Sequence, residues 1–219
     1  MRQYKTLIIC LFFISIFCFS KANALIKDYT LLGKIIYIDP GHGGVDAGAI
    51  SNTILEKDIN LLLSKKLEST LTSKGAIVYL TRDGDYDLSK STINRKRNDL
   101  YNRVKLINNS KADIYISIHL NSSTSNKWSG IQLFYSNIIK ENKILAETIT
   151  NTLKQNMKNI RDVKKENNYY MYSKIKIPGI LIEAGFISNP NDNYKIRQNT
   201  YQDTLINNIA LGIEKYFNN

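Results

Sequence analysis

Short apolar runs alternate along this chain with longer segments in which apolar residues recur every three or four positions. The run at 35–38 has the length of a buried strand. The segment that follows it carries a helical stripe made by Ile59, Leu62, Leu63, Leu67 and Leu71. Strands that alternate with helices predict a sheet covered by helices. The 219 residues therefore indicate a single α/β domain with a sizeable core.

The same apolar runs and helical periodicities predict the residue range of each strand and helix. Strands are expected at about 34–39, 76–81, 114–119, 130–136 and 179–183, with a further short one at 169–173. Helices are expected at about 55–74, 94–109 and 140–157, and a C-terminal helix is marked by Ile206, Ala210, Ile213 and Phe217. Loops are expected at 84–94, 121–129 and 159–168. No internal repeat or linker divides the chain.

The first 24 residues have the pattern of a signal peptide. Arg2 and Lys5 form a positive start, Thr6–Ser20 is apolar, and Ala22–Ala24 is a cleavage site of the A-x-A type. The alternative is an uncleaved membrane anchor, although the apolar stretch is short for a span. Both interpretations predict export across the cytoplasmic membrane, with residues 25–219 forming the catalytic domain.

The positions of the cysteines and the net charge limit the catalytic groups and the partners that the mature chain can have. Cys10 and Cys18 both lie within the predicted signal peptide, so the mature chain has no disulfide and no thiolate. Removal of three cations, Arg2, Lys5 and Lys21, lowers the formal net charge from +11 to +8. A basic exported protein suits an anionic polymer of the cell envelope. Nucleic acid is the general alternative for a basic chain, but export argues against it.

The only two histidines follow apolar runs. His42 lies in the glycine-rich segment Asp39–Gly44, directly after the first run, and His119 ends the run that starts at Ile114. Ligands of open α/β sheets bind at the carboxyl ends of the strands, where these residues are expected. Taken alone, His42 is equally well explained as a turn residue and His119 as a half-buried histidine with satisfied hydrogen bonds.

Two carboxylates occupy comparable positions. Glu56 opens the helix at 55–74, and Glu183 closes the apolar run at 179–183. Taken alone, Glu56 is better explained by a capping box with Thr53, and Glu183 by a structural ion pair. Jointly, two histidines and a carboxylate supply a known catalytic zinc set, with a second carboxylate as base. No His-Glu-x-x-His helix, Gly-x-Ser-x-Gly elbow or cysteine nucleophile is present, which leaves hydrolysis by metal-activated water.

The segments of the chain that carry these four residues, and several others, resemble the zinc-dependent N-acetylmuramoyl-L-alanine amidases of the Amidase_3 family. The resemblance covers residues 34–217 and rests on Ile38–Ala49, Leu55–Leu61, Thr81–Asp83, Arg103–Val104, Ala112–Asp113, Ser117–Asn121 and Ile182–Pro190. It implies that His42, Glu56 and His119 bind Zn²⁺ and that Glu183 is the catalytic acid and base. It also implies a single α/β domain around a mostly six-stranded twisted sheet flanked by helices. The chain departs from the family pattern in the polar region 86–98, whose path is left open, and at 108–111.

The activity implied is hydrolysis of the amide bond between N-acetylmuramic acid and L-alanine in peptidoglycan. A signal peptide followed by a bare catalytic domain resembles the germination-specific amidases of the spore cortex, which act with a deacetylase to form muramic-δ-lactam. This places the protein in the cell wall, the forespore intermembrane space or the cortex. The alternatives are a vegetative or phage-like autolysin, a zinc deacetylase acting on the sugar, and a non-catalytic wall-binding protein. The sequence does not reveal the oligomeric state or an accessory protein.

Overall fold

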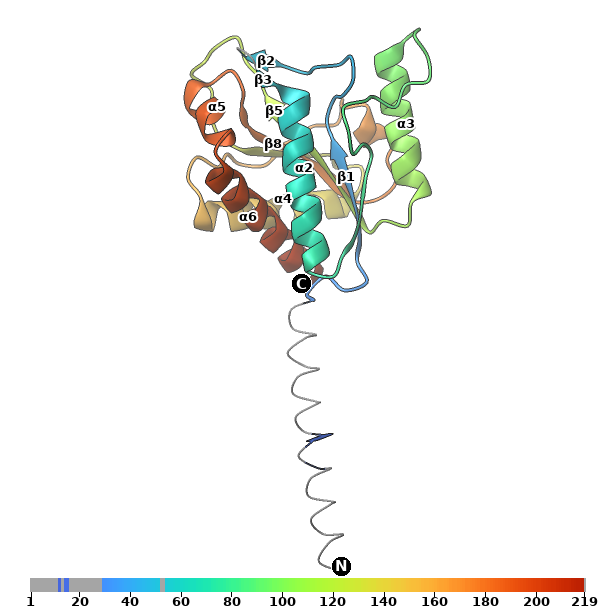
Figure 1. Cartoon of the computed structure of the whole chain (residues 1–219), viewed down its shortest axis with the longest axis vertical. Helices are drawn as coiled ribbons and strands as arrows, with labels where there is room; N and C mark the ends of the chain where they lie inside the picture. Colours follow the sequence, from blue (N-terminus) through green and yellow to red (C-terminus); the bar gives the residue numbers. More distant parts are fainter. Residues whose placement is uncertain (1–11, 13, 16–28, 52–53, 219) are drawn as a thin grey trace, which may run out of the picture.

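The computed structural model describes residues 12, 14–15, 29–51 and 54–218. Residues 29–51 and 54–218 contain a mixed sheet with helices on both faces (Figure 1). The sheet has six strands in the order β4-β1-β5-β8-β6-β7, which confirms the predicted α/β class and strand number. Its strands are β1 (Ile35–Pro40), β4 (Ile77–Leu80), β5 (Ile114–Asn121), β6 (Gln132–Tyr135), β7 (Lys164–Lys165) and β8 (Gly179–Phe186). The other elements are the hairpin β2 (Ile50–Ser51) and β3 (Ile54–Leu55), the helices α2 (Glu56–Ser73), α3 (Arg95–Asn109), α4 (Lys140–Asn156), α5 (Pro190–Ile196) and α6 (Asn199–Asn218), and the 3₁₀ helix η1 (Met171–Ser173).

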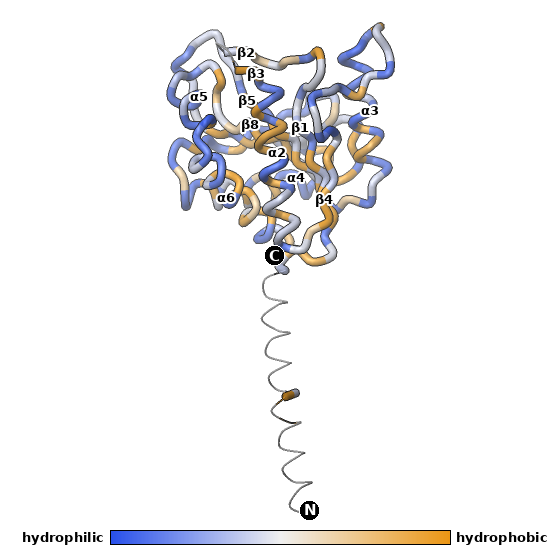
Figure 2. The backbone as a smooth tube through the Cα atoms, in the orientation of Figure 1, coloured by the Kyte–Doolittle hydropathy of each residue, from blue (hydrophilic) through white to orange (hydrophobic). Residues whose placement is uncertain are grey.

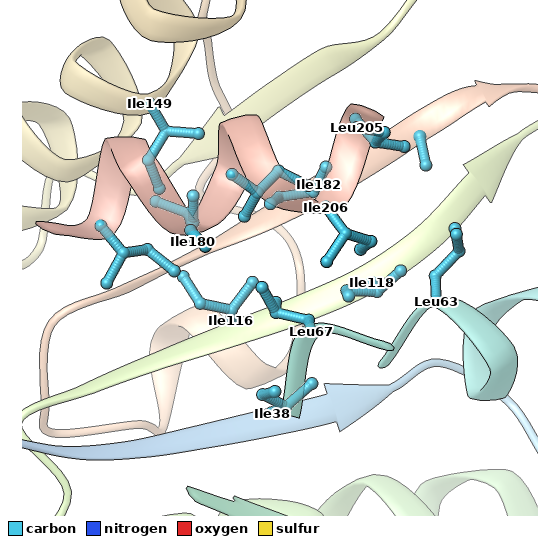
Figure 3. Close-up of a cluster of buried hydrophobic side chains, with 14 of the residues drawn as sticks. Ile38, Leu63, Leu67, Ile116, Ile118, Ile149, Ile180, Ile182, Leu205 and Ile206 are labelled. Atoms are coloured by element: carbon cyan, nitrogen blue, oxygen red, sulfur yellow. The ribbon is translucent and has the colours of Figure 1, made fainter. Parts of the chain in front are cut away.

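Side chains alternate between two cores, one on each face of the sheet. Ile116 and Ile118 face a core formed with α2, α4 and α6, whereas Tyr115 faces a smaller core formed with α3 and η1. Figure 3 shows part of the larger core, where isoleucines of β5 and β8 meet Leu63 and Leu67 of α2. The hydrophobic stretches of the backbone run through the central strands (Figure 2). Each fully buried aliphatic side chain of this kind contributes about 1.5–3 kcal/mol to folding.

The central strands bring the candidate site residues to one edge of the sheet. β1, β4, β5 and β8 are mutually parallel, whereas β6 pairs antiparallel with β8 and β7 runs parallel to β6. The carboxyl ends of β1, β5 and β8 therefore meet at the same edge. His119 and Glu183 are register partners on adjacent strands. They do not terminate their strands as predicted, because β5 continues to Asn121 and β8 to Phe186 across a register shift.

Most predicted elements are confirmed, and the exceptions have physical reasons. The predicted strand at 169–173 is wrong: Met171–Ser173 form η1, because Met171 and Tyr172 pack into the smaller core and the Tyr172 hydroxyl forms hydrogen bonds with the backbone of Phe134 and Leu181. The segment 159–168 is not all loop, since β7 pairs with β6 at the edge of the sheet. Leu62 of the predicted stripe is 40% exposed. Helix α5 was not predicted, although Asn189 caps it and Pro190 occupies its first turn.

The N-terminal predictions fall almost entirely outside the described residues. Of the predicted signal peptide, only Phe12, Ile14 and Ser15 are described. Within the described part of the chain, no helix is both long enough and apolar enough to cross a bilayer.

Candidate metal centre

The loop after β1 turns sharply at His42 and presents its imidazole at the sheet edge. His42 has a φ of 61°, in the left-handed region that few side chains occupy. Two buried arginines hold this loop by its carbonyl oxygens. Arg103 donates to the oxygens of Pro40 and His42 at 2.7 and 2.6 Å, and Arg82 donates to that of Gly41 at 2.9 Å. These hydrogen bonds stabilise a backbone conformation that the loop itself disfavours.

Glu56 is the first residue of α2 and directs its carboxylate back toward the strands. Its Oε2 accepts a hydrogen bond from the backbone N–H of Ala49 at 2.8 Å, and its Oε1 accepts one from that of Leu120 at 3.1 Å. The capping box is not supported, because α2 begins at Glu56 after Leu55 and a capping-box glutamate would lie two residues further into the helix. Thr53, its proposed partner, lies outside the described residues. Glu56 is thus available as a ligand.

The three predicted ligands converge. His42 Nε2 lies 3.2 Å from Glu56 Oε1, and His119 Nδ1 lies 3.1 Å from the same oxygen. The ligand atoms of all three residues lie within 4.8 Å of one another. Two atoms bonded tetrahedrally to one zinc ion at ~2.0–2.2 Å lie ~3.4 Å apart. The donors and their separations therefore fit a zinc ion.

Two glycines leave room for this cluster. A Cβ on Gly41 would overlap the imidazole of His119. A Cβ on Gly48, whose φ is +68°, would lie 2.6 Å from Glu56 Oε2 and 2.7 Å from the His42 ring. Glycine is needed at both positions because no side chain fits between the backbone and the ligands.

Asp46 fixes the orientation of the His42 imidazole, on the side of the ring away from Glu56. Its Nδ1 lies 3.0 Å from Asp46 Oδ2, which leaves Nε2 facing Glu56. Carboxylates commonly hold the far nitrogen of a metal-binding histidine in this way. Burial lowers the pKa of His42, but its hydrogen bonds and charge interactions with Glu56 and Asp46 outweigh this and raise it. Burial likewise raises the pKa of Glu56, but His119 and His42 hold it well below its usual range.

Two buried polar atoms beside the cluster lack hydrogen-bond partners among the described residues. They are His119 Nε2 and Glu183 Oε2. An unsatisfied buried polar atom is costly and requires an explanation. A water on a metal bound here would provide a partner for Glu183 Oε2, so this atom also fits a metal centre, whereas His119 Nε2 would remain the far nitrogen of a ring whose Nδ1 faces Glu56.

Glu183 lies in an environment that favours its protonated form. Burial raises its pKa to about 8, with a further contribution from the charge of Glu56, while His42 acts in the opposite direction. The structural ion pair considered from the sequence is absent, since Glu183 forms no salt bridge within the described part of the chain. A carboxyl group of this kind can accept and return a proton near neutral pH.

A pocket of about 110 Å³ opens onto His42 and His119. Its wall includes residues to which sequence reasoning gave no role: Asp39, Asp46, Lys96, Leu100, Arg103 and Tyr169. Asp39 and Arg103 form a buried ion pair at 2.8 Å behind the loop. The sequence could have identified Arg103 as a buried, paired residue. It lies on the apolar side of its helix, where burial of a charge costs free energy unless the charge is paired.

The polar region whose path the sequence left open lies against α3. Leu88 donates its N–H to Asp99 at 2.7 Å and accepts a hydrogen bond from Asn102 at 2.6 Å. Asp87 pairs with Arg95 at 2.8 Å. These contacts fix one flank of the pocket.

Comparisons with known proteins agree with the fold and with the family that the sequence resembles. A family model described as N-acetylmuramoyl-L-alanine amidase matches residues 36–215. The chain is 44% identical over 192 residues to the germination-specific N-acetylmuramoyl-L-alanine amidase of Bacillus subtilis, covering 85% of this chain and 81% of that protein. It is 33% identical to the amidase LytC of the same organism, of which it covers 36%. The CwlD amidase of Clostridioides difficile, solved in complex with the GerS lipoprotein, superposes with a TM-score of 0.81 at 37% identity, covering 85% of this chain and 99% of that one.

Proposed function

The chain belongs to the N-acetylmuramoyl-L-alanine amidase family, and on this premise we propose that it hydrolyses the bond between N-acetylmuramic acid and L-alanine using a zinc ion held by His42, Glu56 and His119. The observation that carries the proposal is the convergence of both imidazoles on Glu56 Oε1, at 3.2 and 3.1 Å, beside Glu183, whose Oε2 has no hydrogen-bond partner among the described residues. Two imidazoles and one carboxylate with an open position form a known catalytic zinc set.

The roles of the chain's own residues follow from their positions. A zinc ion bound here would lower the pKa of its water to about 7 and polarise the lactyl carbonyl. Glu183 takes the proton of the attacking water as general base. It then returns a proton to the L-alanine nitrogen, so that the amine can leave. Asp46 keeps His42 oriented, and the loop held by Arg82 and Arg103 keeps the site rigid. The products are a glycan strand with free lactyl groups and a released stem peptide.

Digestion of purified peptidoglycan by the zinc-loaded protein tests the chemistry. Mass spectrometry should detect released stem peptides with a free L-alanine amino group. Release of acetate with an amine left on the glycan would indicate the deacetylase alternative. The absence of any product in the presence of zinc would favour a non-catalytic wall-binding protein. His42→Ala and His119→Ala should each remove zinc binding and activity together.

We further propose that the physiological substrate is spore cortex peptidoglycan. The support is the 44% identity to the germination-specific amidase, of which this chain covers 81%. A deletion should leave vegetative growth normal and remove muramic-δ-lactam from the cortex. Normal lactam in the mutant spores would instead favour a vegetative or phage-like autolysin of the same chemistry. Because the C. difficile CwlD structure is a complex with a lipoprotein, we also propose an accessory protein for this chain.

The protein is proposed to act outside the cytoplasmic membrane, with residues 1–24 as its signal peptide. Cleavage after Ala24 should give a mature protein that begins at Leu25. N-terminal sequencing of exported material checks this, and retention of Met1 would indicate an uncleaved anchor.

A further inference from the structure

The metal pocket continues into a groove along the N-terminal half of α3. It shares Lys96 and Leu100 with a neighbouring hollow of about 530 Å³, which Arg97 and Tyr170 also line. That hollow shares Arg97 and Tyr170 with a third hollow of about 370 Å³. We refer to these two outer hollows as the α3 groove. Figure 1 shows α3 on the opposite side of β1 from α2, so the groove leads away from the larger core.

The groove carries two available positive charges. Arg95 is neutralised by Asp87, whose carboxylate lies 2.8 Å away. Lys96 is 71% exposed and lies 3.6 Å from Asp46, a carboxylate already engaged by His42. Arg97 is exposed and forms no ion pair with any described residue. Arg97 is therefore free to bind an anionic ligand, and exposed Lys96, whose pair with Asp46 is long and shared with His42, can exchange that contact for one.

The carboxylates near the groove do not cancel these charges. Asp99 accepts hydrogen bonds from Arg103 and from the N–H of Leu88. The Asp87 side chain is buried against Arg95, and Asp46, which is 30% exposed, contacts His42 at 3.0 Å. Each nearby carboxylate is thus occupied, and the groove keeps a positive potential that attracts anions.

The outer end of the groove adds apolar surface. Ile93 is 76% exposed and Tyr101 is 53% exposed, and both line the third hollow. Exposed apolar side chains beside cations suit a ligand that combines carboxylates with aliphatic groups. A glycan strand consists mainly of neutral sugars, whereas the stem peptide on the other side of the scissile bond is acidic and aliphatic.

We propose that the α3 groove binds the stem peptide and that Lys96 and Arg97 pair with its carboxylates. This inference rests on the proposed function and names the part of the substrate that the groove recognises. It makes Lys96 and Arg97 specificity determinants that act on substrate binding. The peptide then leaves the metal centre across Leu100 and Tyr170.

The test uses two synthetic glycan fragments that each bear one stem peptide. In one fragment the peptide carboxylates are free, and in the other they are amidated. The zinc-loaded mature protein should show a lower KM for the free form. Arg97→Gln and Lys96→Gln should each raise the KM for the free form, relative to the amidated form, about two- to fivefold, the range expected for exposed ion pairs. Added salt should reduce the preference of the unmodified protein.

Lys105→Gln is the matched control, because Lys105 is exposed on the same helix but does not line the groove. It should leave the KM ratio of the two fragments unchanged. Equal KM values for both fragments with the unmodified protein would overturn the inference while leaving the amidase activity intact. An equal effect of Lys105→Gln and Arg97→Gln would also overturn it, since net charge alone would then explain the preference. Cleavage of neither fragment would reject the proposed function, and the inference with it.

Discussion

Individual side chains in the candidate metal centre have roles that their hydrogen bonds distinguish. Both carboxylates are largely buried, but Glu56 accepts two backbone N–H hydrogen bonds and lies beside both imidazoles. Glu183 has an oxygen without a partner in the described part of the chain, and burial raises its pKa to about 8. The first environment favours a permanently ionised ligand, and the second a group that exchanges a proton.

Substitution of each carboxylate by its amide separates these roles. Glu183→Gln keeps the shape and removes the base, so zinc content and fold should be near normal and the rate should fall at least about 10²-fold. Glu56→Gln should weaken zinc binding, because an amide is a poorer ligand than a carboxylate. Metal analysis and turnover of peptidoglycan measure both effects. Loss of zinc from Glu183→Gln, together with retention in Glu56→Gln, would reverse the two assignments.

Gly41 is required by the position of His119. Gly41→Ala places a Cβ in steric overlap with Cε1 of the His119 imidazole, so the ring must shift from its place beside Glu56. We expect loss of zinc binding and of activity, with the fold retained. Gly84→Ala is the control, since its Cβ would meet only the Tyr86 ring, at 3.2 Å. Zinc titration followed by isothermal calorimetry compares them, and equal affinity of the two variants would contradict the steric argument.

At the level of elements, the β1–α3 contact holds the loop that carries His42. The Asp39 carboxylate accepts from Arg103 at 2.8 Å, from Thr81 at 2.6 Å and from Ser117 at 2.8 Å. Burial alone would raise the pKa of Asp39, but Arg103 and these hydrogen bonds lower it below its usual value. The charged network therefore joins β1, β4, β5 and α3 behind the site.

The low pKa of Asp39 predicts acid sensitivity. A carboxyl group with a lower pKa in the folded state stabilises the protein above its unfolded pKa of about 3.9. That contribution is lost as the pH falls through the folded pKa. Asp39→Asn leaves Arg103 without this partner and should cost about 3–5 kcal/mol at pH 7. The difference from the unmodified protein should shrink below about pH 4.

Urea denaturation at pH 7 and pH 3.5 measures this dependence. Asp203→Asn serves as a control, because Asp203 is 59% exposed in its pair with Lys66 and should cost under about 1 kcal/mol at either pH. A difference between Asp39→Asn and the unmodified protein that does not depend on pH would argue against the assigned ionisation.

For the molecule as a whole, the candidate metal centre links three separate parts of the chain. The loop after β1, the start of α2 and the strand β5 each supply one candidate ligand. A metal ion bound by all three stabilises the folded state, because the unfolded chain does not hold these residues together.

Zinc should therefore raise the melting temperature. At a concentration about 100-fold above Kd, binding adds about 2.7 kcal/mol, which corresponds to about 5–10 °C for a domain of this size. Thermal unfolding of chelator-treated protein with and without zinc checks the shift. His119→Ala should show little or none of it. A shift of the same size in His119→Ala would place the stabilising zinc elsewhere.

The sequence by itself determined the α/β class, the main strands and helices, and the residue types at the site. These follow from local periodicity and from the placement of His42, Glu56, His119 and Glu183 next to apolar runs. The helix bounds agree with the structure to within one residue, because amphipathic spacing is a local property.

Only the tertiary structure decided which residues meet. The predicted strand at 169–173 is replaced by η1 at Met171–Ser173, because Met171 and Tyr172 pack into the smaller core beside Tyr115. Asp99, one turn earlier on α3, is a local partner of Arg103, but Asp39 and the carbonyl oxygens of the His42 loop lie more than 60 positions away in the sequence, so no local pattern identifies them. The continuity of the metal pocket with the α3 groove likewise depends on how α3 packs beside β1. Periodicity records which face of an element is buried, whereas the fold determines what that face is buried against.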